Sequence, residues 1–394
     1  MGARTALVIP ASTGTGRGGV QMRMAALHAA MASAVPCELV ELRCDRYQGC
    51  RARCAVTGGL PAGCAVKNYH DRAFCEDYAS QLIRQFVADR VSVVVCSHLF
   101  TYRYAVRFAE SGRLRVILDI HNVESVLSHD IRAALPDGSP AKRWTHTEGH
   151  VAAVRAVELA AVGAADELWT CSERDRALAM STFGLGGKRV VVVPNAVQVT
   201  DPPPAAKPSR IVFTGRLDYY PNTLAALFLI DEVAPRLTAL GCQVPIVIAG
   251  ADPPPALRAR PLPDGVTVLP DPESTADLIN GSIMAVPLTL GGGTRFKILE
   301  AFQCGAPVVS TVKGAEGLDL TAEVHYLPGE DADAFAGALS ELARNAPLRE
   351  RLATSGWSLL RDRYSTGALR SRLAATFRTH SWPQNVETGG TAPS

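Results

Sequence analysis

Short apolar runs alternate along the chain with longer segments in which alanine and leucine recur at helical spacing. This alternation is typical of βαβ units built around a parallel sheet. In the first half, strands are predicted at residues 5–10, 37–42, 91–96, 115–120, 166–171 and 190–193. In the second half, strands are predicted at 210–214, 245–249, 266–269, 283–288 and 306–311, followed by helices at 333–345, 347–364 and 366–379. The pattern therefore predicts an α/β protein with two doubly wound, Rossmann-like units.

A proline-rich stretch separates the two series of strands. Residues 201–208 read Asp-Pro-Pro-Pro-Ala-Ala-Lys-Pro, and stacked prolines disfavour both helix and sheet. A chain of 394 residues also exceeds what one core usually organises, at about 150 residues per domain. We therefore predict an N-terminal domain at 1–198, a linker at 199–209, and a C-terminal domain with closing helices at 210–380. The polar residues 381–394 are predicted to form a disordered tail.

The charges of the chain are nearly balanced, with 40 Lys and Arg against 38 Asp and Glu. Such a chain has no broad basic surface for nucleic acid or an anionic membrane, so we expect neither as a partner. No apolar run approaches the roughly 20 residues of a membrane span. The start of the sequence enters a strand directly, without the pattern of a signal peptide. We therefore expect no transmembrane segment and a cytoplasmic location.

The segment most informative about chemistry is residues 286–310, which reads as strand, glycine loop, helix, glycine stop and strand. The loop is formed by Gly291, Gly292 and Gly293. Three residues without a Cβ let backbone N–H groups approach a ligand closely. Thr294 is expected as the N-cap of the following helix. A diphosphate at this helix end would meet the positive end of the helix dipole and the cations of Arg295 and Lys297.

Glu300 follows on the same helix, about six residues from its expected start. At 1.5 Å per residue the carboxylate lies roughly 8–9 Å beyond the phosphate-binding end, which is the reach to a ribose. It could accept hydrogen bonds from both ribose hydroxyls, as the acidic residue of a Rossmann site does. Gly305 and Pro307 are expected to end the helix. The segment therefore predicts a site for a nucleoside diphosphate.

This segment resembles the donor-binding signature of the family-four retaining glycosyltransferases (glycosyl transferases group 1), especially the branch that reads Gly-Gly-Gly-Thr-Arg followed by Lys and Glu-Ala. The likeness continues through residues 308–317, and three further stretches match the family in the right order: 119–124, 192–195 and 212–222. The resemblance implies the GT-B fold, in which two Rossmann-like domains face each other across a cleft. The first domain would bind the acceptor and the second the nucleotide-sugar donor.

The resemblance also implies roles for individual residues. Glu300 binds the donor ribose, Arg216 and a cation near the glycine loop hold the diphosphate, and His121 lines the donor sugar. Gly19 approaches the phosphate from the first domain. The predicted catalytic residues are His121, Arg216, Arg295 and Lys297, and the predicted donor-binding residues are Gly18, Gly19, Gly215, Gly291, Gly292, Gly293, Thr294 and Glu300.

The sequence departs from the family pattern at two places. Many members carry a glutamate that faces the transferred sugar, and Gly292 stands in its place. Members also often carry a lysine about a turn after the equivalent of Arg216, where this chain reads Pro221-Asn222. We expect Arg295 or Lys297 to supply the missing positive charge and backbone N–H groups to take over the contact with the sugar.

The implied reaction transfers a sugar from a nucleotide-diphosphate-sugar to a hydroxyl or amine acceptor, with retention of anomeric configuration. Fixed cations and helix N–H groups stabilise the charge that the leaving diphosphate gains. We therefore expect no metal and no cofactor beyond the nucleotide-sugar co-substrate. The pair Asp331 and Asp333 resembles a metal-binding DxD, but it precedes a predicted helix as its cap and acidic first turn. The expected acceptor is a soluble small molecule or glycan.

Three other functions stay open on the sequence. A nucleotide-sugar epimerase of the same fold would need acid–base carboxylates, for which Glu124 and Glu148 are candidates. An NAD(P)-dependent oxidoreductase would use the Gly-x-Gly-x-x-Gly spacing within residues 14–19, with Glu38 about twenty residues on. A non-catalytic sugar-nucleotide-binding protein would explain the loss of the glutamate at Gly292.

Six cysteines crowd the chain from Cys37 to Cys75, within and beside a long predicted insert at residues 43–75. The insert could recognise the acceptor, hold zinc or an iron–sulfur cluster, or carry disulfides, but no spacing is Cys-x-x-Cys, and we favour reduced thiols. His146 and His150 are spaced as a zinc-binding pair on a helix, although the rest of a metalloprotease motif is missing. We interpret them as part of a polar or acceptor-facing surface.

Overall fold

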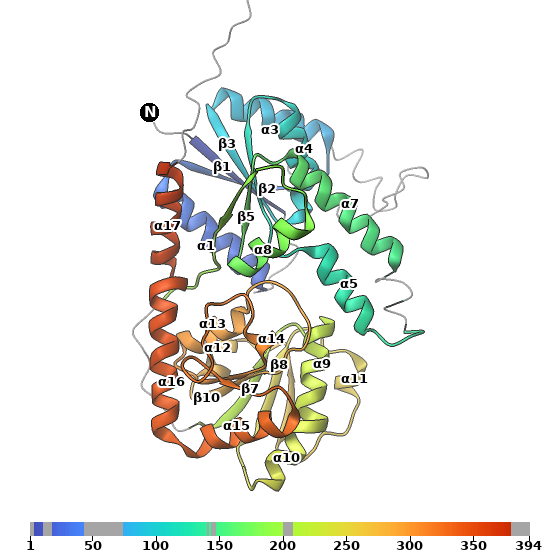
Figure 1. Cartoon of the computed structure of the whole chain (residues 1–394), viewed down its shortest axis with the longest axis vertical. Coiled ribbons are helices and arrows are strands. Elements are labelled where there is room, and N and C mark those ends of the chain that lie inside the picture. Colours follow the sequence, from blue (N-terminus) through green and yellow to red (C-terminus); the bar gives the residue numbers. More distant parts are fainter. Residues whose placement is uncertain are drawn as a thin grey trace, which may run out of the picture. The chain divides into compact units, whose positions relative to one another are not determined.

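The computed structural model describes residues 4–10, 18–42, 74–139, 142, 147–199 and 208–379. The chain divides into two compact units, each with its own parallel sheet (Figure 1). Unit 1 comprises Met1–Ser125, Thr147–Val193 and Arg370–Ser394, and unit 2 comprises Val126–His146 and Pro194–Leu369. The predicted α/β class with two Rossmann-like sheets is confirmed.

The described strands of unit 1 form a six-stranded parallel sheet in the order β2-β1-β3-β4-β5-β6. They are β1 (Arg4–Pro10), β2 (Cys37–Leu42), β3 (Val91–Ser97), β4 (Arg115–Asp119), β5 (Glu167–Thr170) and β6 (Arg189–Val192). The central strands are buried almost throughout, as in β3, whose sequence is Val-Ser-Val-Val-Val-Cys-Ser. Such near-continuous apolar runs are expected where helices cover both faces of a parallel sheet.

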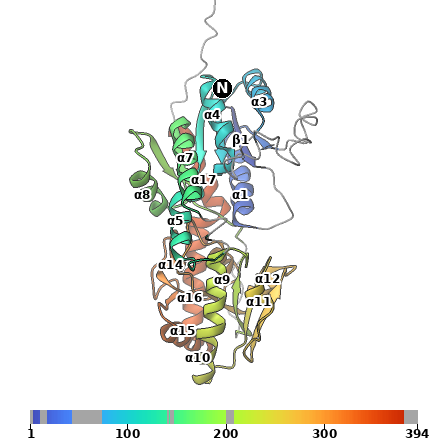
Figure 2. The same cartoon turned by 90° about the vertical axis from the view of Figure 1, so that its right-hand side faces the viewer.

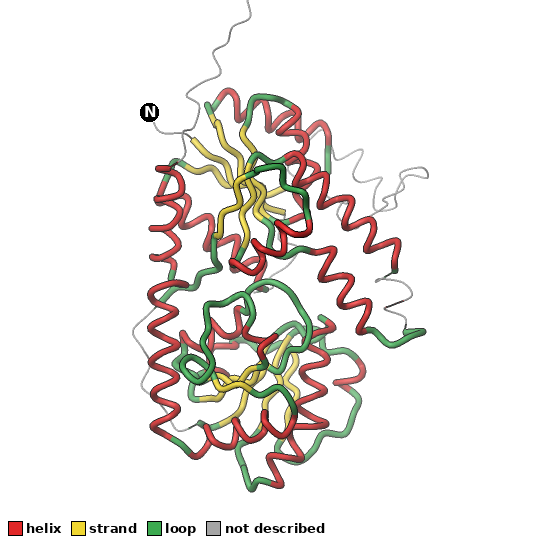
Figure 3. The backbone as a smooth tube through the Cα atoms, viewed as in Figure 1, coloured by secondary structure: helices red, strands yellow, loops and turns green. Residues whose placement is uncertain are grey.

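The helical elements that precede β7 in the chain are α1 (Gly19–Ala34), α3 (Glu76–Ala88), η4 (Leu99–Thr101), α4 (Tyr102–Glu110), α5 (Glu124–Ala134), α7 (Glu148–Ala164) and α8 (Glu173–Thr182). Figure 3 shows helices surrounding the strands of this sheet. Phe86 of α3 and Phe108 of α4 are both buried and pack edge to face, with ring centroids 5.6 Å apart. The apolar spacing that predicted these helices therefore corresponds to the face that packs in the core.

The described strands of unit 2 also form a six-stranded parallel sheet, in the order β12-β11-β10-β7-β8-β9. They are β7 (Arg210–Thr214), β8 (Ile246–Gly250), β9 (Val266–Pro270), β10 (Ser282–Val286), β11 (Val308–Ser310) and β12 (Leu327–Pro328). The described helical elements that follow β7 in the chain are α9 (Tyr220–Phe228), η5 (Leu229–Val233), α10 (Ala234–Ala239), α11 (Pro255–Arg258), α12 (Thr275–Ile279), α13 (Phe296–Gln303), α14 (Val312–Ala315), α15 (Ala332–Arg344), α16 (Ala346–Leu359), η6 (Leu360–Tyr364) and α17 (Thr366–Thr379), which belongs to unit 1 from Arg370 onward. Figure 2 shows α9, η5 and α10 as one continuous helical rod.

The sequence prediction located the described elements closely. Residues 37–42 and 210–214 are strands with the predicted bounds, and 366–379 is a helix with the predicted bounds. The predicted helix at 347–364 is α16 continued by a π-helical turn, η6. The sequence prediction missed β12, because a strand of two residues has no periodicity to detect.

Several predictions concern residues outside the described ranges. The insert at 43–75 is described only at residues 74 and 75, the linker at 199–209 only at its ends, and the tail at 381–394 not at all. Cys37, at the start of β2, carries a free thiol. Among the helices that the structure describes, none has the length and apolar character needed to cross a bilayer.

Both sheets contain a point where the order of strands reverses. In unit 1 the chain places β2 on one side of β1 and β3 on the other, and in unit 2 it places β8 on one side of β7 and β10 on the other. Ligands of open parallel sheets bind outside the carboxyl ends of the strands at such a reversal. A ligand site is therefore expected at the segments that follow β7 and β10, and at those that follow β1 and β3.

Candidate functional site

In unit 2 the carboxyl ends of β7 and β10 lie side by side, because these strands pair in register from Arg210 with Ser282 onward. The chain leaves β7 through Gly215, whose φ of 152° favours glycine. Gly250 ends the neighbouring strand β8, and a Cβ on Gly250 would overlap the carbonyl oxygen of Gly215. These two glycines therefore let the main chain of β7 and β8 approach closely where the predicted phosphate site begins.

The glycine loop follows β10 and leads into α13. Gly291 and Gly293 have φ values of 119° and 65°, a region that side chains disfavour. The expectation that Thr294 caps the helix is wrong, because α13 begins at Phe296 with Arg295 as its N-cap. The hydroxyl of Thr294 instead donates to the carbonyl oxygen of Gly317 at 3.5 Å. The loop therefore packs on residue 317 and turns into the helix one residue later than the sequence suggested.

Arg295 is buried beneath this loop, with 6% of its surface exposed. Its guanidinium donates to the carbonyl oxygens of Gly292, Gly293 (3.0 Å) and Lys313 (3.2 Å). A planar group with several donors in fixed positions is well suited to bracing a loop in this way. In this structure Arg295 therefore holds the glycine loop to α14.

Lys297 lies in the first turn of α13 and reaches back toward β7. Its Nζ is 2.9 Å from Oδ1 of Asn222 and 4.0 Å from the ring centroid of Phe213. Burial and the charge of Arg295 lower the pKa of Lys297 to about 7, and the charge of Glu300 opposes the shift. The amine therefore lies beside β7 at the reversal of strand order, between the neutral amide oxygen of Asn222 and the ring face of Phe213.

Glu300 is the fifth residue of α13, so at 1.5 Å per residue it lies about 6 Å beyond the start of the helix. That is shorter than the 8–9 Å expected, because the helix begins later than predicted. Burial raises the pKa of Glu300, and the charge of Lys297 lowers it. Gly305, with φ of 64°, ends the helix as predicted, since Ala306 N–H donates to Ala301 O and Gly305 N–H to Phe302 O.

Arg216 follows Gly215 and is largely exposed, with 59% of its side chain accessible. It donates to both carboxylate oxygens of Asp218, at 3.0 and 2.7 Å, and to Asp252 at 3.0 Å. Its position at the carboxyl end of β7 fits the predicted phosphate role. To bind a phosphate, the guanidinium would exchange at least one of these two carboxylates for the ligand.

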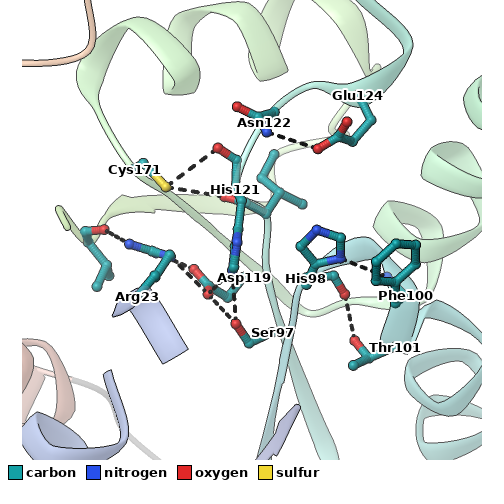
Figure 4. Close-up of polar contacts among 12 residues, drawn as sticks. Arg23, Ser97, His98, Phe100, Thr101, Asp119, His121, Asn122, Glu124 and Cys171 are labelled. Atoms are coloured by element: carbon teal, nitrogen blue, oxygen red, sulfur yellow. Dashed lines mark hydrogen bonds and ion pairs between the residues drawn. The ribbon is translucent and has the colours of Figure 1, made fainter. Parts of the chain in front are cut away.

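In unit 1 a buried polar cluster lies where β3 and β4 end (Figure 4). Asp119, the last residue of β4, is fully buried and receives a bidentate contact from Arg23 of α1. Ser97 donates to Asp119 Oδ2 at 2.7 Å, and Arg23 also donates to Val193 O at 2.9 Å. Burial alone would raise the pKa of Asp119, but Arg23 and His121 hold it well below its usual range.

The sequence prediction assigned no role to Arg23. The only signal was a charged residue in a mostly apolar helix, Val-Gln-Met-Arg-Met-Ala-Ala-Leu. Its partner Asp119 is 96 positions away. An arginine that is 2% exposed needs such a carboxylate, so burial identifies the pair once the fold is known.

His121 follows this cluster and is held by it. Its Nε2 lies 3.3 Å from Asp119 Oδ2 and 3.1 Å from Ser97 Oγ, and its ring stacks edge to face on His98 at 4.9 Å. Burial lowers the pKa of His121, the carboxylate of Asp119 raises it, and Arg23 lowers it. A neutral ring that donates from Nε2 to Asp119 presents Nδ1 as an acceptor. His98 itself has φ of 71°, a strained conformation at a strand end.

Two glutamates lie beside the start of α5, of which Glu158 is buried and Glu124 is half-buried. Glu158 of α7 accepts the N–H of Ser125 with both oxygens at 3.2 Å. Burial raises its pKa to about 7. Burial also raises the pKa of Glu124, which accepts from Asn122 at 2.9 Å. Glu148, the other epimerase candidate, is exposed in the first turn of α7.

The remaining candidates that the structure describes lie at the starts of helices. Gly18 is the N-cap of α1 and Gly19 its first residue. Asp331 caps α15 by accepting from Ala334 N–H at 2.8 Å, as expected, and Asp333 pairs with Arg236 at 2.7 Å. Within the part of the chain that the structure describes, no group of three or more His, Cys, Asp or Glu is arranged to hold a metal. His146, Gly14 and Gly16 lie outside the described residues.

The fold defines a two-unit α/β protein with glycines and cations at the strand ends where ligands of open parallel sheets bind. Residues 208–345 match the family model of the glycosyl transferases group 1, which confirms the resemblance seen in the sequence. This match covers most of unit 2 and supports sugar transfer as the general activity. A search of curated protein sequences gives no match.

Solved structures are similar over nearly the whole chain. The sucrose-phosphate synthase of Thermosynechococcus elongatus is 16% identical, with a TM-score of 0.65 over 95% of this chain and 98% of that one. Anabaena Alr3699/HepE, in complex with UDP, is 12% identical, with a TM-score of 0.63 over 95% of this chain and 100% of that one. TarM is 13% identical, with a TM-score of 0.56 over 73% of this chain and only 55% of that one. At these identities the likeness shows the fold, and it confirms the GT-B prediction.

Proposed function

We propose that the protein transfers a sugar from a nucleotide-diphosphate-sugar to a soluble small-molecule or glycan acceptor in the cytoplasm, with retention of configuration at the anomeric carbon. The observation that carries the proposal is the grouping of Lys297, Gly215 and the glycine loop at the reversal between β7 and β10. The family match over residues 208–345 supports it, as does the UDP bound in the Anabaena neighbour.

On this proposal the donor diphosphate lies at the start of α13, and Glu300 accepts hydrogen bonds from the ribose. The diphosphate gains charge as its bond to the anomeric carbon breaks, so Lys297 and Arg216 bind the transition state more tightly than the donor. A phosphate oxygen of the leaving group takes the proton of the acceptor, and no protein nucleophile or metal is required. His121, held by Asp119, accepts a hydrogen bond from the transferred sugar.

A thermal-shift screen with UDP, GDP, ADP and dTDP tests donor binding, because a ligand raises stability by mass action. One of the four is expected to stabilise the protein, and Glu300→Ala should abolish that shift. Glu341→Ala, at an exposed position of α15, is the matched control and should preserve it. Tight binding of NAD(P) without binding of any nucleoside diphosphate would overturn the proposal in favour of an oxidoreductase.

Product analysis separates the remaining functions. With the matching nucleotide-sugar and a panel of hydroxyl acceptors, NMR of the product should show the same anomeric configuration as the donor. Glu124 and Glu158 keep the epimerase alternative open, because carboxyls with raised pKa values can act as acids. An epimerase converts the nucleotide-sugar in the absence of any acceptor. Binding without turnover of any kind would indicate a sugar-nucleotide-binding protein.

A further inference from the structure

Lys297 is half-buried and has no acidic partner among the residues that the structure describes. The groups that face it are Phe213 from β7 and Asn222 from α9, together with Arg295 and Glu300 at the start and middle of its own helix. None of the described carboxylates forms an ion pair with its Nζ, and its one hydrogen bond goes to the amide oxygen of Asn222 at 2.9 Å. A buried ammonium ordinarily has a carboxylate or several acceptors around it. The surroundings of Lys297 therefore suit an amine better than a permanent cation.

Asn222 is fixed in the orientation that this contact requires. The side chain is 8% exposed, and its Nδ2 donates to the carbonyl oxygen of Arg216 at 2.8 Å. With the amide nitrogen engaged there, Oδ1 must face Lys297. The residue is isosteric with aspartate but carries no charge. It therefore aligns the Lys297 side chain without stabilising its protonated form as a carboxylate would.

The opposing influences on Lys297 can be compared in size. The ring face of Phe213, 4.0 Å from Nζ, favours the ammonium through a cation–π contact. Burial and the charge of Arg295 disfavour it, and together they lower the pKa from 10.5 to about 7 against the charge of Glu300. In the empty protein the amine is therefore mostly neutral at the pH of an ordinary cytoplasm or slightly above it.

We propose that Lys297, aligned by Asn222, is a proton-coupled ligand for the donor diphosphate: it is a neutral amine in the empty site and takes up a proton when the diphosphate binds. The inference rests on the proposed function, because it requires a diphosphate at this strand reversal. The oxygens of the diphosphate supply the negative charge that a paired carboxylate would otherwise provide. The ammonium of Lys297 therefore forms only when the diphosphate is bound. Asn222 is a positioning residue, and its neutrality makes the coupling possible.

The proposal predicts how affinity changes with pH. Lys297 is expected to stay protonated in the complex. The dissociation constant of the diphosphate then rises above pH 7, because Lys297 of the empty site loses its proton there. A free-site pKa of about 7 then gives an increase of about 20-fold between pH 7.5 and 9.0. This window lies above the second phosphate ionisation, near pH 6, so the ligand does not change charge within it. At pH 8.0, binding should take up about 0.9 proton.

Isothermal titration calorimetry in HEPES and in Tris at pH 8.0 measures this proton count, with the nucleoside diphosphate that gives the largest thermal shift as the probe. Lys297→Met should bind more weakly and take up no proton. Lys297→Arg should keep binding without uptake, because arginine is always charged. Asn222→Asp should also lose the uptake, since a carboxylate holds Lys297 protonated in the empty site. Lys188→Met in unit 1 is the control that should leave the count unchanged.

The wild-type protein alone suffices to overturn the inference. Measurable binding with no net proton uptake at pH 8.0, or with a dissociation constant that is constant from pH 7.5 to 9.0, contradicts it and leaves the proposed function intact. Uptake that persists in Lys297→Met assigns the proton to another group and also contradicts it. If none of the four nucleoside diphosphates binds at any pH, the proposed function fails and the inference fails with it.

Discussion

The buried pair of Arg23 and Asp119 makes a strong prediction about unit 1. The substitution Asp119→Asn keeps the size of the side chain and an acceptor for Ser97, but it leaves the guanidinium of Arg23 without its carboxylate. Arg23 is 2% exposed and Asp119 is 0% exposed, so water cannot replace the lost partner. Removing one member of such a pair costs about 3–5 kcal/mol. That cost is a large fraction of the stability of an ordinary domain.

Hydrogen–deuterium exchange with mass spectrometry measures the effect where it occurs. If amides of β3 and β4 exchange through opening of unit 1, a loss of about 3–5 kcal/mol accelerates them by about 150- to 5000-fold. Because the pKa of Asp119 is held well below its usual range, its carboxylate contributes stability above the unfolded pKa and loses it only in strong acid. The ratio of variant to wild type should therefore be the same at pH 5 as at pH 7.

Two further variants complete this test. Arg23→Met combined with Asp119→Asn should recover much of the lost protection, because no unpaired charge remains buried. Glu173→Gln breaks an exposed ion pair with Arg176 on α8 and should change exchange in β4 little, since such pairs contribute about 1 kcal/mol or less. If Asp119→Asn leaves exchange in β4 within about fivefold of wild type, the pair does not hold the sheet as argued.

Two other substitutions test the packing and the buried charge. Gly250→Ala places a Cβ against the carbonyl oxygen of Gly215 and should destabilise the protein by about 1–3 kcal/mol in urea unfolding. Gly337→Ala has open space around the new Cβ and should stabilise the protein by about 0.5–1 kcal/mol. Equal effects of the two variants would contradict the close approach of β7 and β8. The pKa of Glu158 is raised to about 7, so the folded state binds more protons at this group than the unfolded state does. The contribution of Glu158 to stability therefore falls as pH rises from about 4.5 to 7. Glu158→Gln should therefore gain stability relative to wild type across this range, and a difference that is independent of pH would refute the shift.

Sequence reasoning located the strands and the glycine loop because their signals are local. Apolar runs such as Val91–Ser97 are buried on both faces and read as strands wherever they occur. Gly305 ended its helix as predicted, since only a residue that accepts positive φ suits that position. The N-cap was misplaced by one residue because Thr294 contacts Gly317, which lies 23 positions away and gives no local signal.

The chain by itself thus determined the two parallel sheets, the glycine loop at residues 291–293 and the candidate cations beside it, because periodicity and residue type are properties of neighbouring positions. Only the tertiary structure decided which groups meet. It placed Lys297 on Asn222, 75 positions away, and Arg23 on Asp119, 96 positions away. Contacts over such separations depend on the order of the strands in each sheet. The contacts and the loss of hydration then decide whether a lysine is a charged ammonium or a neutral amine.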